Sequence, residues 1–208
     1  MGMYKNLSSA LKSPLDVTTL KLNYKKEEFP EDFFLFKNIE TAYLTLENVN
    51  TLPNFFSPLS KLKTIYIQAK KVTEIPRSLM QLPSLETLNL AGTPISKFDL
   101  AGDQNRTLKT LILNNIPREE IPQNLEFIEG LESLSLAGNK LTHFPKNLFF
   151  LESLKKLSLD NNLLTALPCD QILTNLPHLN SISLDGNKFS HDEKKLIEQK
   201  LNYIFSAI

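Results

Sequence analysis

Apolar residues recur along this chain at one fixed spacing. The clearest unit carries apolar residues, an asparagine and a proline at Leu131, Leu134, Leu136, Asn139, Leu141, Phe144 and Pro145. The same seven positions recur 23 residues later at Leu154, Leu157, Leu159, Asn162, Leu164, Leu167 and Pro168. Six further units begin at Val17, Ile39, Leu62, Leu85, Leu108 and Leu179. The pattern therefore predicts eight turns of one structural unit.

Each unit is predicted to contain a strand and a returning segment. Apolar and polar residues alternate around Ile65 and Ile67, and a period of two indicates a half-buried strand. A spacing of three, as at Leu148, Leu151 and Leu154, favours a 3₁₀ or short helical return. Successive strands are expected to stack as a parallel concave sheet, with the returns on the convex side. Proline, which lacks an N–H, follows the turn in five units at Pro53, Pro76, Pro122, Pro145 and Pro168.

The ninth position of the unit separates the two halves of the chain. In the C-terminal units it is Asn139, Asn162 or Asn187, whose amide is expected to satisfy backbone groups of adjacent coils. Earlier units carry Glu47, Lys70, Thr93 and Ile116 there. We therefore expect the C-terminal half to be more regular, and the earlier turns to use other partners or water.

Both ends of the stack need covering, because a terminal unit exposes its apolar face. Ser190 to Glu193 matches a capping box and predicts a helix with one apolar stripe, formed by Leu196, Ile197, Leu201, Ile204 and Phe205. Tyr4 to Leu11 is predicted as a shorter helical cap that ends at Pro14. The predicted organisation is an N-terminal cap over 1–16, eight repeats over 17–189 and a C-terminal capping helix over 190–208.

The fourth unit departs from the pattern on its convex side. Asp99 replaces the proline, and Leu100 to Thr107 resembles a polar loop with Gly102 and Asn105 where two core leucines are expected. Such breaks can be functional or strained. The alternative is simple drift of one repeat, which the intact strand residues favour. This unit is expected to be the least stable part of the stack.

Strand positions between the core residues project from the concave face. The second position alternates in charge through Glu40, Lys63, Glu86, Lys109, Glu132 and Lys155. Neighbouring strands lie about 4.8 Å apart, so this column predicts a ladder of cross-strand ion pairs, each contributing about 0.2–1 kcal/mol. The ladder implies fixed register and no chemistry.

The fifth position changes character along the stack. It is large in the first units and small in the last, in the order Lys21, Tyr43, Tyr66, Asn89, Ile112, Ser135, Ser158 and Ser183. Exposed tyrosine clusters are typical interface anchors, although tyrosine also favours strands for its β-propensity alone. With two residues of the eighth position added, the predicted partner-binding residues are Tyr24, Tyr43, Leu46, Tyr66, Asn89 and Ile112.

Residues 17–189 resemble leucine-rich repeat proteins of the 23-residue type with a Leu-Pro ending, found in many bacterial proteins and in the intracellular Ras-group-related class. The resemblance is carried by the two units 131–145 and 154–168, and by Asp185, Gly186 and Asn187 before the capping helix. It implies an α/β leucine-rich repeat solenoid with a right-handed coil, a parallel concave sheet and a convex side of 3₁₀ and short helical segments. The motif specifies the fold and leaves the partner open.

Composition narrows the class of partner. The 208 residues carry 23 basic and 23 acidic side chains, so the net charge of zero gives no footprint for nucleic acid or an anionic membrane. Cys169 is the only cysteine, which excludes a disulfide-built secreted domain and favours a reducing compartment. No stretch approaches a membrane span, and the first residues lack the apolar run of a signal peptide. We therefore expect a cytoplasmic protein, or one that enters a host cell without a signal peptide.

Catalytic and metal-binding patterns are weak. Cys169 with His143 or His178 is the one Cys/His combination, and a lone cysteine after a turn proline is more often a packing residue. The three histidines have no metal-ligand spacing, and no catalytic or cofactor motif occurs. The sequence therefore predicts a monomeric, non-catalytic protein-binding module with no cofactor. The alternatives are a regulator of a small GTPase or kinase pathway and a bacterial effector that acts on a host protein.

Overall fold

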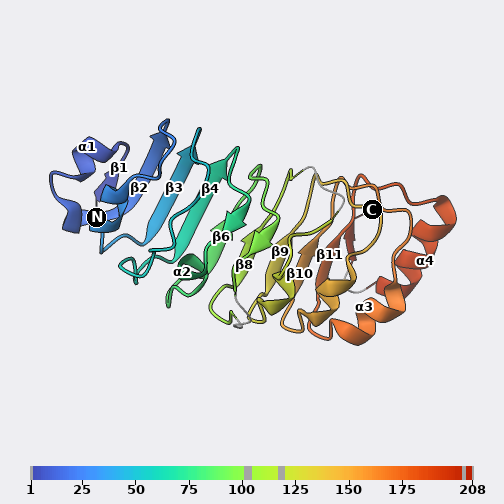
Figure 1. Ribbon diagram of the computed structural model, residues 1–208. Coiled ribbons are helices and arrows are strands. Elements are labelled where there is room, and N and C mark those ends of the chain that lie inside the picture. Colours follow the sequence, from blue (N-terminus) through green and yellow to red (C-terminus); the bar gives the residue numbers. More distant parts are fainter. Residues whose placement is uncertain (1, 101–104, 117–119, 203–204, 208) are drawn as a thin grey trace.

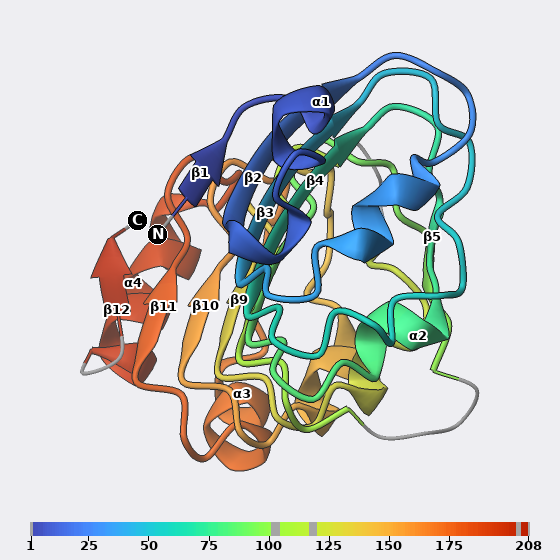
Figure 2. The ribbon, with the colours of Figure 1, turned by 90° about the vertical axis from the view of Figure 1, so that its left-hand side faces the viewer.

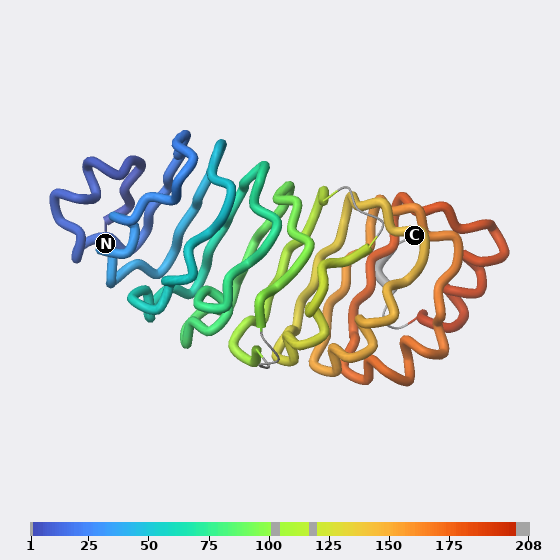
Figure 3. Tube along the Cα trace, viewed as in Figure 1, coloured from blue at the N-terminus to red at the C-terminus, as the bar shows by residue number. Residues whose placement is uncertain are grey.

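The computed structural model describes residues 2–100, 105–116, 120–202 and 205–207. Successive coils stack side by side into an elongated rod that runs from the N-terminal to the C-terminal end (Figure 1). Each coil returns along the opposite side from its strand, as the tube in Figure 3 shows. Viewed along the rod, the strands form one layer, and the convex segments lie across the core from it (Figure 2).

One parallel sheet runs the length of the rod, as the repeat predicted. In the described part of the chain it has ten strands, each paired in parallel with its neighbours. Corresponding positions of neighbouring coils face each other, so that Thr41 of β3 aligns with Thr64 of β4. In sheet order the strands are β1 Gly2–Tyr4, β2 Val17–Tyr24, β3 Thr41–Leu46, β4 Thr64–Ala69, β6 Thr87–Asn89, β8 Thr110–Ile112, β9 Ser133–Ser135, β10 Lys156–Ser158, β11 Ser181–Ser183 and β12 Phe205–Ala207.

The convex side is built from short segments, as the spacing of three predicted. Two of them, β5 and β7, pair with each other, and Glu74 and Lys97 form an ion pair of 3.2 Å across that pair. The strands here are β5 Glu74–Ile75 and β7 Lys97–Phe98, and the helical segments of the chain are α1 Leu7–Ala10, η1 Pro14–Asp16, η2 Glu31–Leu35, α2 Arg77–Met80, η3 Leu125–Phe127, η4 Lys146–Phe150, α3 Cys169–Asn175 and α4 His191–Leu201.

The eighth residue of each unit sets the length of its strand. In the last five units this residue has a left-handed φ between 54° and 72°, and a strand of three residues ends three positions before it. These residues are Gly92, Asn115, Gly138, Asn161 and Gly186. Glycine and asparagine are the residues that adopt this conformation readily. The first three units carry Tyr24, Leu46 and Ala69 instead, and their strands stay extended for eight, six and six residues.

Side-chain amides join the C-terminal coils, as predicted. Asn162 is buried, and its Nδ2 donates to the carbonyl oxygens of Leu136 at 3.0 Å and Leu159 at 2.9 Å. Its Oδ1 accepts the N–H of Leu141 at 3.1 Å. The amide therefore satisfies backbone groups in adjacent coils. The same three kinds of bond are made by Asn139 and Asn187.

In the fourth unit a threonine hydroxyl replaces the asparagine amide as the hydrogen-bonding group. Thr93 is fully buried, and its Oγ1 donates to the carbonyl oxygen of Ile67 at 2.9 Å. The same oxygen accepts the N–H of Ala69 at 3.0 Å. The expectation that earlier turns use other partners is confirmed at this position, where a shorter side chain reaches two backbone groups of the preceding coil.

The C-terminal cap differs from the helix predicted over 190–208. α4 ends at Leu201, and β12 then pairs with β11 and extends the sheet. Backbone groups at an open sheet edge need partners that an amphipathic helix cannot supply, and a strand supplies them. Within the predicted apolar stripe, Ile197 and Leu201 are buried, Leu196 is 41% exposed and Phe205 lies on β12. Ile204 lies outside the described residues.

The capping box is also rearranged. Ser190 Oγ accepts the N–H of Glu193 at 3.2 Å, as the motif requires. The Glu193 carboxylate does not return to Ser190 and instead accepts the N–H of Leu167 at 2.9 Å. Lys200 adds an ion pair of 2.8 Å to Asp170 of α3. The helix is therefore fastened to the preceding coil by side chains as well as by packing.

The N-terminal cap predicted as a helix over Tyr4–Leu11 is also wrong in part. Tyr4 belongs to β1, which pairs with β2, and the helix α1 covers only Leu7–Ala10. Asn6 starts α1, because its Oδ1 accepts the N–H of Ser9 at 2.8 Å. Pro14 begins η1, a position where its missing N–H costs nothing. At both ends of the rod, therefore, a short strand pairs with the outermost repeat strand and covers the sheet edge.

The fourth unit is less open than its sequence predicts. Leu100 and Asn105 are both buried. The Asn105 amide donates to the carbonyl oxygen of Met80 and accepts the N–H of Leu108 at 3.0 Å. Asparagine thus takes a core position because its polar atoms bond to the backbone. Residues 101–104 of the predicted polar loop, which include Gly102, lie outside the described residues.

Candidate protein-binding surface

Two tyrosines stand side by side on the concave face. Tyr43 of β3 and Tyr66 of β4 are partners in the sheet register, and their rings stack with centroids 4.6 Å apart and planes 16° apart. Tyr43 is 36% exposed and Tyr66 is half-buried. Successive residues of a strand point to opposite faces, so Ala42 and Leu44 beside Tyr43, and Ile65 and Ile67 beside Tyr66, face the core. The stack is therefore a rigid aromatic surface on a fixed sheet.

A shallow depression surrounds the stacked rings. Its volume is about 310 Å³, and it is open to solvent along the sheet. Polar side chains of the strand positions form much of the remaining wall. The lining residues are Lys21, Tyr43, Leu44, Thr45, Tyr66, Ile67, Gln68, Asn89 and Ala91.

The seventh position contributes residues that the sequence reasoning missed. Thr45, Gln68 and Ala91 occupy it in three successive units, and all three line the depression. The signal was available, because the fifth and seventh positions lie two residues apart and share one face of a strand. The eighth position, which was included instead, points the other way.

The structure corrects two of the predicted binding residues. Leu46 is fully buried, because β3 remains extended through this residue and its alternation carries Leu46 into the core with Ala42 and Leu44. Tyr24 packs against the same core and lines a separate depression beside α1. Neither residue belongs to the surface formed by the stacked rings.

The remaining predicted residues lie in the expected column. Register pairs Tyr66 with Asn89 and Asn89 with Ile112, so the fifth positions continue along the sheet. Asn89 and Ile112 are both half-buried. The Asn89 carboxamide accepts the N–H of Ala91 at 3.0 Å, so part of its hydrogen-bonding capacity is used locally.

The serines at the fifth position of the last coils, Ser135, Ser158 and Ser183, donate hydrogen bonds to residues at the seventh position. Asp160 accepts the hydroxyl of Ser158 at 2.9 Å, the hydroxyl of Ser183 and the N–H of Asp185 at 2.8 Å. Two coils earlier, Asn114 accepts the hydroxyl of Ser135 at 2.6 Å and the N–H of Ala137 at 3.0 Å. Polar groups already paired within the sheet offer little to a partner.

The predicted charge ladder forms as two separate groups. Lys63 pairs with Glu40 at 3.0 Å, and Glu132 pairs with Lys155 at 2.7 Å and with Lys109 at 3.6 Å. The hydrogen bond from Lys155 holds the pKa of Glu132 below its ordinary value, with a smaller contribution from the charges of both lysines. Within the described residues Glu86 forms no ion pair with the lysines beside it, so a continuous ladder is wrong. Long exposed side chains need not meet when the backbone already fixes the register.

The one Cys/His combination shows no sign of activation. Cys169 is buried, and burial raises the pKa of its thiol, which disfavours the nucleophilic thiolate. His143 is exposed and its Nδ1 lies 2.9 Å from the hydroxyl of Thr142. Among the described residues, no group of three or more His, Cys, Asp or Glu side chains is placed to hold a metal ion.

Comparison with known proteins identifies the architecture. Residues 129–189 match the family model described as leucine rich repeat. The solved structure of a leucine-rich repeat protein from Leptospira interrogans superposes on 100% of this chain with a TM-score of 0.67 and 24% sequence identity. The fold is that of a leucine-rich repeat protein. A second solved structure with a similar fold is that of human trophoblast glycoprotein, also called Wnt-activated inhibitory factor 1, with a TM-score of 0.64 and 22% sequence identity.

These structural similarities establish the fold alone. The chain spans 58% of the Leptospira chain, and the human alignment covers 89% of this chain and 72% of that one. No curated protein sequence matches the chain significantly. None of the helices in the described ranges is long and apolar enough to cross a lipid bilayer.

Proposed function

We propose that this chain is a non-catalytic protein-binding module that holds a protein partner on the concave face of its N-terminal half. The observation that carries the proposal is the stacked pair Tyr43 and Tyr66. Stacking already restricts the two rings, so they lose little further conformational freedom when a partner binds. Tyrosines buried at an interface are also frequent hot spots. The leucine-rich repeat fold commonly serves protein recognition, which supports this class of function.

The chemistry around the rings favours a largely uncharged partner surface. Besides Lys21, the residues of the depression are neutral, and hydroxyl and amide groups flank the aromatic faces. In the charge column, Glu40, three residues before Tyr43, is already paired with Lys63. Ten strands separated by about 4.8 Å give a sheet about 43 Å long. That length accommodates a standard interface of about 800 Å² on each side.

We further propose that the chain acts in the cytosol, either of its own cell or of a host. The single buried thiol of Cys169 supports a reducing compartment. Resemblance to the 23-residue class supports two settings, regulation of a small GTPase or kinase pathway and action as an effector on a host protein. Identification of the captured partner separates these settings.

The test is affinity capture with mass spectrometry, followed by binding measurements with the partner recovered. Tyr43→Ala and Tyr66→Ala should each weaken binding by about 30-fold, which corresponds to about 2 kcal/mol. Ser181→Ala on the distant β11 is the matched control. Melting curves should show that all three variants remain folded. Unchanged affinity in both tyrosine variants would place binding elsewhere on the molecule.

A further inference from the structure

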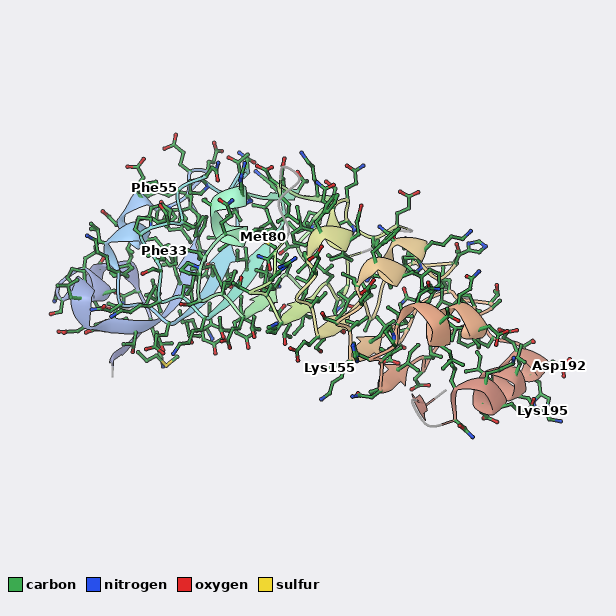
Figure 4. The ribbon with its side chains drawn as sticks, turned by 90° about the horizontal axis from the view of Figure 1, so that it is seen from below. Phe33, Phe55, Met80, Lys155, Asp192 and Lys195 are labelled. Carbon is green, nitrogen blue, oxygen red and sulfur yellow. The ribbon has the colours of Figure 1, made fainter. Side chains whose placement is uncertain are left out.

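A second aromatic surface lies on the outer side of the first two coils. Phe55 is 57% exposed and Leu35 is 48% exposed, and the half-buried Phe34 contacts Phe55 edge to face with ring centroids 5.5 Å apart. We call Phe34, Leu35 and Phe55 the outer aromatic surface. Figure 4 shows Phe55 at the outer margin of the coils and Phe33 deeper inside.

The core holds this surface in place. The Phe34 ring packs against the buried rings of Phe29 and Phe56, with centroids 5.7 Å and 5.4 Å away. Both of those rings also contact each other. An exposed apolar side chain on a rigid base cannot turn away from solvent. Large exposed apolar groups of this kind mark interaction sites.

Four carboxylates come just before Phe34 and Leu35 in the chain, and they line one depression together with Lys26. Glu27, Glu28, Glu31 and Asp32 are all exposed, and we call them the acidic rim. Glu31 and Asp32 open η2, a 3₁₀ helix in which residues three apart lie on the same side. Asp32 therefore shares a side with Leu35, and Glu31 shares a side with Phe34.

One basic residue of the same depression, Lys26, stands against the four carboxylates of the acidic rim, so the rim keeps a net negative charge. Within the described residues none of its four carboxylates lies within ion-pair distance of a basic group, whereas nearby Lys25 pairs with Glu47 at 3.7 Å. Acidic residues also favour the start of a helical turn. That effect accounts for Glu31 and Asp32 and leaves Glu27, Glu28 and the exposed apolar side chains without a structural role.

Charge decides between the possible occupants. Four unpaired carboxylates repel an anionic membrane or a nucleic acid backbone. A symmetric dimer through this surface would bring eight carboxylates together, and like charges across an interface are strongly unfavourable. We propose that the outer aromatic surface and the acidic rim dock a segment of a partner protein that carries lysine or arginine beside apolar side chains. This interface is separate from the concave one.

The probe is a short synthetic peptide with leucine and lysine at helical spacing. The charge control is the same peptide with glutamate in place of each lysine. Fluorescence anisotropy with the full chain should show binding of the lysine peptide that weakens as salt is raised. Phe55→Ser, which introduces the residue that Ser78 supplies one coil later, should weaken binding about tenfold. Glu31→Gln combined with Asp32→Asn should reduce the salt dependence.

Two further variants make the test specific. Phe150→Ser removes a phenylalanine that is 66% exposed, more than the 57% of Phe55, from a distant coil, and it should leave peptide binding unchanged. Tyr43→Ala should also bind the peptide normally, which separates this interface from the concave one. Equal binding of the glutamate peptide, or no effect of both the Phe55 and the rim variants, would overturn the proposal. So would preferential binding to vesicles containing phosphatidylserine, or self-association that Phe55→Ser abolishes.

Discussion

Asn115 and Gly138 occupy the same position in neighbouring coils, and the asparagine side chain fills the place that a β-carbon on the glycine would need. Both residues have a left-handed φ, 57° and 70°. A β-carbon built on Gly138 would collide with Asn115 Oδ1. Gly186 has the same relationship to Asn161. Gly92 also has a left-handed φ, of 72°, but open space surrounds its Cβ position.

Gly92→Ala and Gly138→Ala should therefore differ in stability. Each forces alanine into a left-handed conformation, which costs about 1–2 kcal/mol. Gly138→Ala should lose more, because the added methyl also displaces Asn115. Chemical denaturation measures both losses, and adding Asn115→Gly to Gly138→Ala should recover the difference. Equal losses in the two single variants would contradict the collision.

Thr93→Val should be costly although it preserves the shape of the side chain. Without the hydroxyl, the carbonyl of Ile67 and the N–H of Ala69 lose their buried partner, and each such group costs about 1–3 kcal/mol. Thr45→Val, on the concave surface, is the control and should change the free energy of unfolding little. If the two variants melt at the same temperature, Thr93 does not replace the asparagine of later coils.

Glu193→Ala should loosen the C-terminal cap. The variant leaves the N–H of Leu167 without its carboxylate acceptor, so we expect a loss of about 1–3 kcal/mol. Glu198→Ala, exposed on the same helix, is the matched control. Hydrogen exchange should show faster exchange at Leu167 in the Glu193 variant alone, and unchanged protection there would argue against this contact.

Glu132 should titrate below an ordinary glutamate, because Lys155 donates to its carboxylate. A lowered pKa in the folded state stabilises the protein above the unfolded pKa, and this contribution is lost as the pH falls through the folded pKa. Lys155→Met should raise the pKa of Glu132 in an NMR titration and reduce that acid-side loss. Lys156→Met, next to it on β10, should leave the pKa unchanged. An unaltered titration in the Lys155 variant would show that the ion pair is not populated.

Periodicity alone predicts most of this architecture. The spacing of leucines defines every coil of the parallel sheet, because each strand buries its apolar residues against the next coil. It also predicts the column that brings Tyr43 beside Tyr66. Leu46 was misplaced because one turn geometry was assumed for all units. The eighth residue carries the missing signal, since leucine cannot easily take the left-handed conformation that Gly138 adopts.

The ends of the rod and the outer aromatic surface are less accessible to sequence reasoning. β12 forms because the open edge of β11 needs backbone partners, and that need comes from the assembled sheet and not from the residues of β12. The stripe through Ile197 predicts the helix but not its end. Similarly, Phe55 and Phe34 lie on different coils, and only the stacked structure brings their rings together.

The alternation between Asn115 and Gly138 gives the last five coils of this solenoid a period of two coils. The charge at the second position alternates with the same period. Glu86 and Glu132, 46 residues apart, lie on coils with glycine at the turn. Lys109 and Lys155 lie on coils with asparagine there. Deleting the single coil 131–153 would set Lys109 beside Lys155 and one turn asparagine over another. Deleting two coils would preserve both relationships. Shortened or lengthened versions of this rod should therefore fold well only when coils are removed or added in pairs.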